Sequence, residues 1–170
     1  SSLAGHLGLD NLVVIYDDNH ITIDGKTDLS FTEDVARRYK AYGWNVIEVP
    51  GDGNDLQAID KAIRRAKACK GKPTVVKVRT HIAFGSPNKH DTSEAHGAPL
   101  GEDEVKLMKQ AFGWDPDQTF LVPDDVYSHM RQCVAKGKKA QAAWQRMLKR
   151  YTKQYPDLAA QFRDALAGRP

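Results

Sequence analysis

The sequence predicts an α/β fold, a doubly wound and mainly parallel sheet followed by C-terminal helices. Three observations support this prediction: short β-branched runs at 12–16, 45–49 and 74–78, helical periodicity between them, and short polar joins. Continuous apolar runs are typical of strands covered on both faces, and strands that alternate with helices predict a parallel sheet. We therefore divide the chain into an α/β region at 1–122 and a helical extension at 123–170 that leads toward an inter-domain linker.

The elements of the first half follow from local signals. Leu3 and Leu7, four residues apart, predict the back half of a helix. Because no helix start signal precedes them, we expect the chain to be an internal or processed piece of a longer protein. Polar residues end the first strand. A helix is then expected with Ser30 or Thr32 as its N-cap and Gly43 at its end, and its apolar positions are Phe31, Val35, Tyr39 and Tyr42.

The remaining elements are mostly helical. Asn54 or Asp55 is expected to cap the helix between the second and third strands. From about residue 102 onward, apolar residues recur at helical spacing in four segments, which predicts amphipathic helices whose apolar stripes face a core. These segments lie at about 102–112, after Pro123, along 140–151 and after Pro156.

Composition excludes several classes of protein. Of the 170 residues, 41% are hydrophobic and 28% are charged, which is typical of a soluble globular chain. No apolar run approaches the roughly 20 residues that cross a bilayer, so we expect no membrane partner. A net charge of +3 is too small to indicate nucleic acid binding. Cys69 and Cys133 are far apart and form no redox pair, which favours a reduced, cytoplasmic location.

The first candidate site is the polar loop that follows the first strand. Ligands in open α/β sheets bind beyond the carboxyl ends of the strands, and Asp17, Asp18 and Asn19 stand at such an end. Carboxylate, amide and main-chain oxygens suit Mg²⁺ or Ca²⁺. Ile21 and Ile23 alternate with polar residues, so both could face one side as an apolar wall. The alternative is an ordinary turn in which Asp and Asn side chains bond their own backbone.

The second candidate site is the loop at 80–100, which follows the third strand and shows no periodicity. A long irregular segment inside a compact domain is usually functional. Histidines held between Gly and Pro can donate to phosphate or move protons near neutral pH. The histidines of this loop are His81, His90 and His96. With no cysteine nearby and no paired spacing, these three are not expected to form a zinc site.

At these loops the sequence resembles the transketolase family, in order along the whole chain. The motifs are Ser2-Leu3-Ala4-Gly5-His6-Leu7, Ile15-Tyr16-Asp17-Asp18-Asn19-His20-Ile21-Thr22-Ile23-Asp24-Gly25, Arg38-Tyr39-Lys40-Ala41-Tyr42-Gly43-Trp44, Phe84-Gly85-Ser86 and His96-Gly97-Ala98-Pro99-Leu100. The matching region is the C-terminal part of the family's thiamine diphosphate-binding domain. The resemblance implies a partial thiamine diphosphate fold and an enzyme that moves a two-carbon ketol unit between sugar phosphates.

The resemblance also implies roles for individual residues. Asn19 would close the cofactor fingerprint and ligate Mg²⁺ or Ca²⁺ through its side-chain oxygen, and Ile21 would add its main-chain oxygen. Ile23 and Ile82 would contact the thiazolium ring. His96 would be the active-site histidine, near the diphosphate and the reacting carbons. A cofactor-binding role is also expected for Asp17.

Three departures from the family pattern qualify these expectations. The Gly-Asp-Gly that opens the fingerprint would lie before Ser1, and we interpret Gly51-Asp52-Gly53 as a turn with a helix cap instead. Ala83 stands where the family has Gly. The catalytic glutamate and the sugar phosphate-binding arginines belong to other segments, so this chain alone is not expected to turn over substrate.

The resemblance leaves the assembly and the substrate to be tested. We expect the remaining transketolase segments as partners, in a homodimer with the cofactor at the subunit interface. Dihydroxyacetone synthase, deoxyxylulose-phosphate synthase and a non-catalytic cofactor-binding or assembly fragment are the alternatives.

Overall fold

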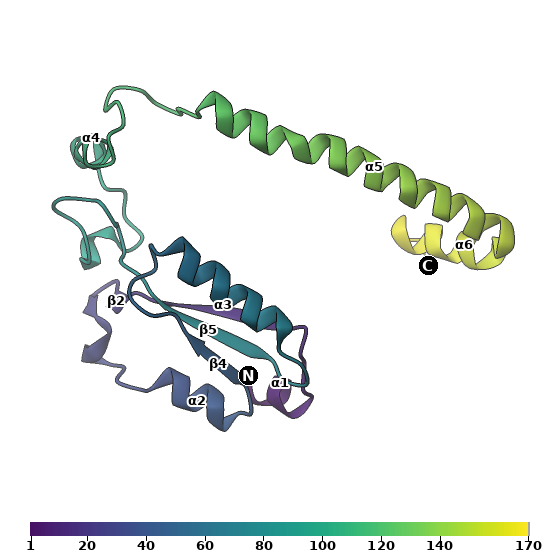
Figure 1. The fold of residues 1–170 in the computed structure, drawn as a ribbon, viewed down its shortest axis with the longest axis horizontal. Coiled ribbons are helices and arrows are strands. Elements are labelled where there is room, and N and C mark those ends of the chain that lie inside the picture. The colour runs from purple at the N-terminus through teal and green to yellow at the C-terminus, as the bar shows by residue number, and fades with distance from the viewer. Residues whose placement is uncertain (170) are drawn as a thin grey trace. The chain divides into compact units, whose positions relative to one another are not determined.

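The computed structural model describes residues 1–169 (Figure 1). It divides into one unit at Ser1–Asp117 and a second that begins at Gln118, and each is described by itself. The domain boundary after residue 122 stays a prediction. The elements of the first unit are α1 (Ser2–His6), β1 (Val13–Asp18), β2 (Ile21–Thr22), β3 (Gly25–Lys26), the 3₁₀ turn η1 (Thr27–Leu29), α2 (Val35–Ala41), β4 (Asn45–Glu48), α3 (Leu56–Ala68), β5 (Thr74–Arg79), the 3₁₀ turn η2 (Ser93–Ala95) and α4 (Glu102–Ala111).

The predicted α/β class is confirmed by a parallel sheet with the order β1-β5-β4. Val76 of the central strand pairs with Ile15 on one side and Ile47 on the other. Figure 1 shows α2 and α3 on opposite sides of this sheet. The core lies between α3 and the sheet, and its buried members are Ile47, Val49, Ala62, Ala66, Val76 and Val78. The helix α3 packs on β4 and β5, and α2 packs on β4, which agrees with the mainly apolar runs of these two strands.

The helix caps follow the chemistry of Asp side chains. The Asp55 side chain accepts hydrogen bonds from the main-chain N–H groups of Gln57 and Ala58, so it caps α3 as predicted. Asp52 accepts from the Asn54 N–H at 2.9 Å, which confirms a turn before that helix.

The cap predicted for α2 was wrong. Asp34, and not Ser30 or Thr32, is the N-cap, and it accepts from the Arg37 N–H. The reason is that η1 uses the preceding residues, since the Phe31 N–H donates to the Thr27 carbonyl at 2.8 Å. Phe31 therefore lies outside the helix.

Two helices form the regular structure described in the second unit, α5 (Asp124–Gln154) and α6 (Pro156–Leu166). They pack together through Trp144 and Phe162, whose rings lie 6.4 Å apart, and through the fully buried Ala159. The sequence predicts two helices where α5 is continuous. An isolated Gly137 costs only about 1 kcal/mol relative to Ala, and neither a proline nor a capping residue stops the helix there.

Candidate functional site

Two loops meet at the carboxyl ends of β1 and β5. The Thr80 hydroxyl, just after β5, donates to the Asp17 carboxylate near the end of β1. The Thr80 N–H donates to the Asp18 carbonyl, and so does the Arg79 guanidinium, at 3.1 Å. Because the two strands are parallel neighbours, both loops leave the same edge of the sheet.

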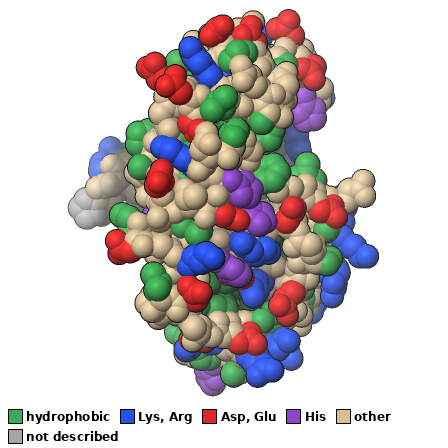
Figure 2. Space-filling view, turned by 90° about the vertical axis from the view of Figure 1, so that its left-hand side faces the viewer, with side chains coloured by type: hydrophobic (Ala, Val, Ile, Leu, Met, Phe, Trp, Pro, Cys, Tyr) green, Lys and Arg blue, Asp and Glu red, His purple; other side chains and the backbone are tan. Residues whose placement is uncertain are grey.

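A cavity of about 610 Å³ opens beside the first loop. Asn19 and Ile21 line it, together with the cationic side chains of Lys26, Lys77 and Arg79. The other predicted site residues are not part of its lining, and these are Asp17, Ile23, Ile82 and His96. Figure 2 shows histidine, acidic and basic side chains close together near the middle of one face.

The Asn19 side chain closes a local turn. Its Oδ1 accepts a hydrogen bond from the Ile21 N–H at 2.9 Å. This is the side-chain-to-backbone bond of an ordinary turn, which the sequence analysis gave as the alternative to a ligand role. An amide oxygen has two lone pairs, so one remains for a second partner. The neighbouring Asp18 carboxylate lies 3.2 Å from both the Lys77 ammonium and the His20 ring nitrogen.

Ile21 and Ile23 do not form the shared apolar wall that their alternation suggests. Ile21 begins the two-stranded β2–β3 hairpin and is 8% exposed, whereas Ile23 lies in its turn and is 67% exposed. A two-residue strand is too short to continue the alternation through the turn. Ile23 therefore presents an apolar side chain that no packing within residues 1–169 buries.

The second loop is ordered by a buried carboxylate. Glu104 of α4 accepts hydrogen bonds from the Ser86 hydroxyl and from the Asn88 N–H and side-chain amide. These bonds, that from Ser86 foremost, lower the pKa of Glu104 to about 2. Ala83, where the family resemblance predicts Gly, has φ of 51°, a left-handed backbone that glycine adopts without strain. The departure therefore lies at a position where the backbone favours glycine.

His96 lies at the far end of this loop, directly after η2. Its N–H donates to the Ser93 carbonyl at 2.9 Å, and its side chain is exposed. Ile82 is partly buried, and its carbonyl accepts from the Asp91 N–H at 3.0 Å.

Sequence reasoning missed the cluster of His81, His90 and Asp91. The His81 Nδ1 lies 2.6 Å from Asp91 Oδ2, and the two imidazole rings stack with centroids 5.1 Å apart. Burial raises the pKa of the Asp91 carboxyl, but the His81 hydrogen bond and the nearby cationic groups outweigh it, so the pKa is lowered overall. His81 and His90 were considered only together with His96, which lies elsewhere in the loop.

Comparisons with known proteins decide the family. The family model described as transketolase, thiamine diphosphate binding domain, matches residues 1–170. The chain belongs to the transketolase family. It is 50% identical to a transketolase from Nostoc sp. and 49% identical to transketolase 1 from Saccharomyces cerevisiae, over 169 residues each. The match covers 99% of this chain and 25% of each relative, so the chain spans about a quarter of their length.

Solved transketolase structures agree with this assignment. The transketolase from Leishmania mexicana matches with a TM-score of 0.86 at 45% identity. A Pichia stipitis transketolase in complex with sedoheptulose-7-phosphate matches with a TM-score of 0.85 at 44% identity. Each match covers 99% of this chain and 25% of the other. Among the described helices of this transketolase-family chain, none combines the length and apolar character needed to cross a bilayer.

Proposed function

We propose that this chain provides part of the cofactor site of a transketolase, an enzyme that transfers a two-carbon ketol unit from a ketose phosphate to an aldose phosphate. The match to a thiamine diphosphate-binding domain over the whole chain carries the proposal. A relative bound to a seven-carbon sugar phosphate supports the substrate class. The proposal includes the pentose phosphate pathway, a cytoplasmic location and a homodimer with the cofactor at the subunit interface.

The first loop fits the anchoring of a divalent cation and a diphosphate. Asn19 Oδ1 has a free lone pair, and the main-chain oxygen of Ile21 lies two residues further on in the same closed turn. These are hard oxygen donors of the kind that Mg²⁺ and Ca²⁺ take. Lys77 and Arg79 line the same cavity and would attract a diphosphate, in competition with the carboxylates of Asp18 and Asp91 that lie 3.2 and 3.9 Å from them. The proposed metal ligands are therefore Asn19 and Ile21.

Four further residues of this chain belong to the proposed site. Thiamine diphosphate, when bound, supplies the nucleophilic carbon and electron sink that C–C bond cleavage next to a carbonyl requires. Ile23 would pack against the thiazolium ring, consistent with its 67% exposure, and Ile82 would support that ring from the second loop. His96 would donate to the diphosphate and move protons near the reacting carbons. Asp17, held by Thr80, would fix the two loops together at the cofactor.

The test uses a full-length transketolase that carries this sequence. Asn19→Ala is expected to weaken magnesium-dependent thiamine diphosphate affinity severely, since it removes both the turn and the ligand. Asn19→Asp keeps a side-chain oxygen that can both accept the Ile21 N–H and ligate the metal. It is therefore the matched control, and we expect it to retain most of that affinity. Equal affinity in the native and Asn19→Ala proteins, measured by calorimetry at fixed Mg²⁺, would contradict the ligand role.

His96→Ala tests the catalytic role separately. We expect turnover to fall by about 10²–10⁴-fold while the thermal unfolding midpoint changes little, because the His96 side chain is exposed. A variant that loses stability but keeps its turnover number would assign His96 a structural role. Assays of the native enzyme with pentose phosphate and with formaldehyde as acceptors separate transketolase from dihydroxyacetone synthase, and no transfer to either identifies a non-catalytic fragment.

A further inference from the structure

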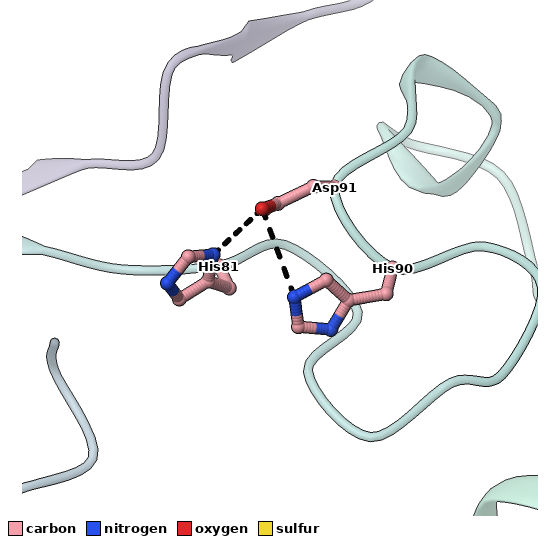
Figure 3. Close-up of side chains that lie close together, drawn as sticks. All are labelled: His81, His90 and Asp91. Atoms are coloured by element: carbon pink, nitrogen blue, oxygen red, sulfur yellow. Dashed lines mark hydrogen bonds and ion pairs between the residues drawn. The ribbon is translucent and has the colours of Figure 1, made fainter.

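Three potential metal ligands converge beside β5 (Figure 3). His81 lies two residues after that strand, and His90 and Asp91 lie in the following loop. Both imidazole rings direct a nitrogen at one carboxylate oxygen, Asp91 Oδ2, at 2.6 Å for His81 Nδ1 and 3.6 Å for His90 Nε2. The ligand atoms of the three residues all lie within 4.8 Å of one another.

The backbone holds this cluster in place. The Asp91 N–H donates to the Ile82 carbonyl at 3.0 Å, which joins the two parts of the loop. Asp91 itself has φ of 53°, a left-handed conformation that non-glycine residues adopt at a cost and that concentrates at functional sites. On the other side of the loop, Glu104 fixes Ser86 and Asn88. The side chains therefore meet on a preorganised loop.

One atom of the cluster lacks a partner. Asp91 Oδ1 is buried, and within residues 1–169 no hydrogen-bond donor reaches it. A buried polar atom without a partner costs about 1–3 kcal/mol, and in native proteins such an atom calls for an explanation such as an ion. The carboxylate could bind a cation through this oxygen as well as through Oδ2.

We propose that His81, His90 and Asp91 form a binding site for a transition-metal cation of the Zn²⁺ type. Imidazole nitrogens favour zinc, cobalt, nickel and copper over magnesium and calcium. Two His and one carboxylate leave a fourth tetrahedral position for water. With metal–ligand distances of about 2.0–2.2 Å, tetrahedral ligand atoms lie roughly 3.3–3.6 Å apart. The two distances to Asp91 Oδ2, 2.6 Å from His81 and 3.6 Å from His90, therefore change by about 1 Å or less.

The charges that face the site set its affinity. The Arg79 guanidinium lies 3.9 Å from Asp91 Oδ2 and opposes a cation, although its other nitrogen is held by the Asp18 carbonyl at 3.1 Å. The Asp91 carboxylate favours the cation. Asp91 lines the same cavity as Asn19, but the ligand chemistry differs, because the proposed donors of the Asn19 loop are all oxygen and this cluster adds two imidazole nitrogens.

The experiment titrates the full-length protein with Co²⁺ in the presence of saturating Mg²⁺ and thiamine diphosphate, after removal of bound metals by a chelator. Tetrahedral Co²⁺ absorbs visible light, so its spectrum reports the geometry directly. We expect one visible Co²⁺ site per chain that Zn²⁺ displaces. His81→Gln, His90→Gln and Asp91→Asn should each weaken Co²⁺ binding by more than about tenfold.

A matched control and clear opposing outcomes complete the design. His129→Gln replaces an exposed histidine of α5 and should leave Co²⁺ affinity unchanged. The proposal is overturned if no visible cobalt band forms, or if His90→Gln and Asp91→Asn bind Co²⁺ as tightly as the native protein. Where His81→Gln or Asp91→Asn fails to fold by circular dichroism, His90→Gln decides, because its ring is about one-third exposed (36%) and tolerates replacement.

Discussion

Gly85→Ala tests the packing of the second loop against α4. Gly85 has φ of +87°, and a Cβ built on it would lie 2.2, 2.6 and 3.0 Å from three ring atoms of Phe112. Two costs follow. An L-residue in this backbone conformation costs about 1–2 kcal/mol, and forcing extra volume against a neighbour costs about 1–3 kcal/mol. We expect the lower end of the second range because the Phe112 ring is 47% exposed and can turn outward.

Gly43→Ala is the matched control. Gly43 has φ of +83°, and a Cβ there would meet no atom within 4 Å. The backbone cost and the entropy effect on the unfolded chain are therefore shared by both variants. The difference between the two destabilisations therefore isolates the contact with Phe112. We expect this difference to be about 1 kcal/mol, which corresponds to a roughly fivefold change in the equilibrium constant for local opening.

Amide hydrogen exchange of the full-length protein measures this difference locally. For each variant, the exchange rate around the substitution is divided by the rate of the same region in the native protein. This acceleration should be about fivefold larger for residues 82–112 of Gly85→Ala than for residues 38–45 of Gly43→Ala. The informative amides are those of Asp91 and Phe112, which donate to Ile82 and Met108. Equal acceleration in the two variants would refute the reasoning, because it would leave only the backbone term and place Phe112 away from Gly85.

Three further substitutions test the same framework. Because Glu104 binds a proton only near pH 2 when folded and near its ordinary 4.5 when unfolded, the stability it contributes is complete above about pH 4.5 and is lost as the pH falls toward 2. Glu104→Gln should therefore flatten the acid-unfolding profile followed by circular dichroism, and an unchanged slope would contradict the lowered pKa. Ala83→Gly should raise the thermal midpoint slightly, since the roughly 1–2 kcal/mol of left-handed strain that it removes exceeds the roughly 0.4–1 kcal/mol that it costs by freeing the unfolded chain; a lower midpoint would oppose this. Val76→Ala, at a fully buried position of β5, should cost about 2 kcal/mol in urea unfolding, and a change below the error would place Val76 outside the core.

The strands were the most predictable part of the fold. The predicted runs at 45–49 and 74–78 correspond to β4 at Asn45–Glu48 and β5 at Thr74–Arg79. The agreement has a physical cause, because β5 lies between two other strands and four of its six residues are buried, which favours apolar residues along most of its length. The β2–β3 hairpin was not predicted, since two-residue strands leave no periodicity to detect.

Helix boundaries were less predictable because competing caps lie close together. Ser30, Thr32 and Asp34 all have suitable side chains, and the 3₁₀ turn at 27–29 decides among them. That turn is invisible to an argument from helical spacing. For the long helix α5 the error was a predicted break that does not exist, since apolar positions on the two sides of Gly137 were assigned to separate helices.

The His81–His90–Asp91 cluster lay beyond prediction from spacing. No motif links residues nine and ten positions apart in an irregular loop. Their convergence depends on the left-handed backbone of Asp91 and on the Glu104 bonds that fix the intervening segment. Neither feature has a sequence signal of its own, because aspartate and glutamate are common at exposed positions.

Asn19 illustrates why a ligand role and a local turn are not competing explanations. The hydrogen bond from the Ile21 N–H holds the amide oxygen and the backbone of residue 21 close together before any cation arrives. A cation bound by both oxygens would then join a loop that is already closed, so less conformational entropy is lost on binding. Under the proposed ligand role, the turn that a sequence argument treats as the ordinary alternative would thus be the arrangement that preorganises the two oxygens for a hard cation.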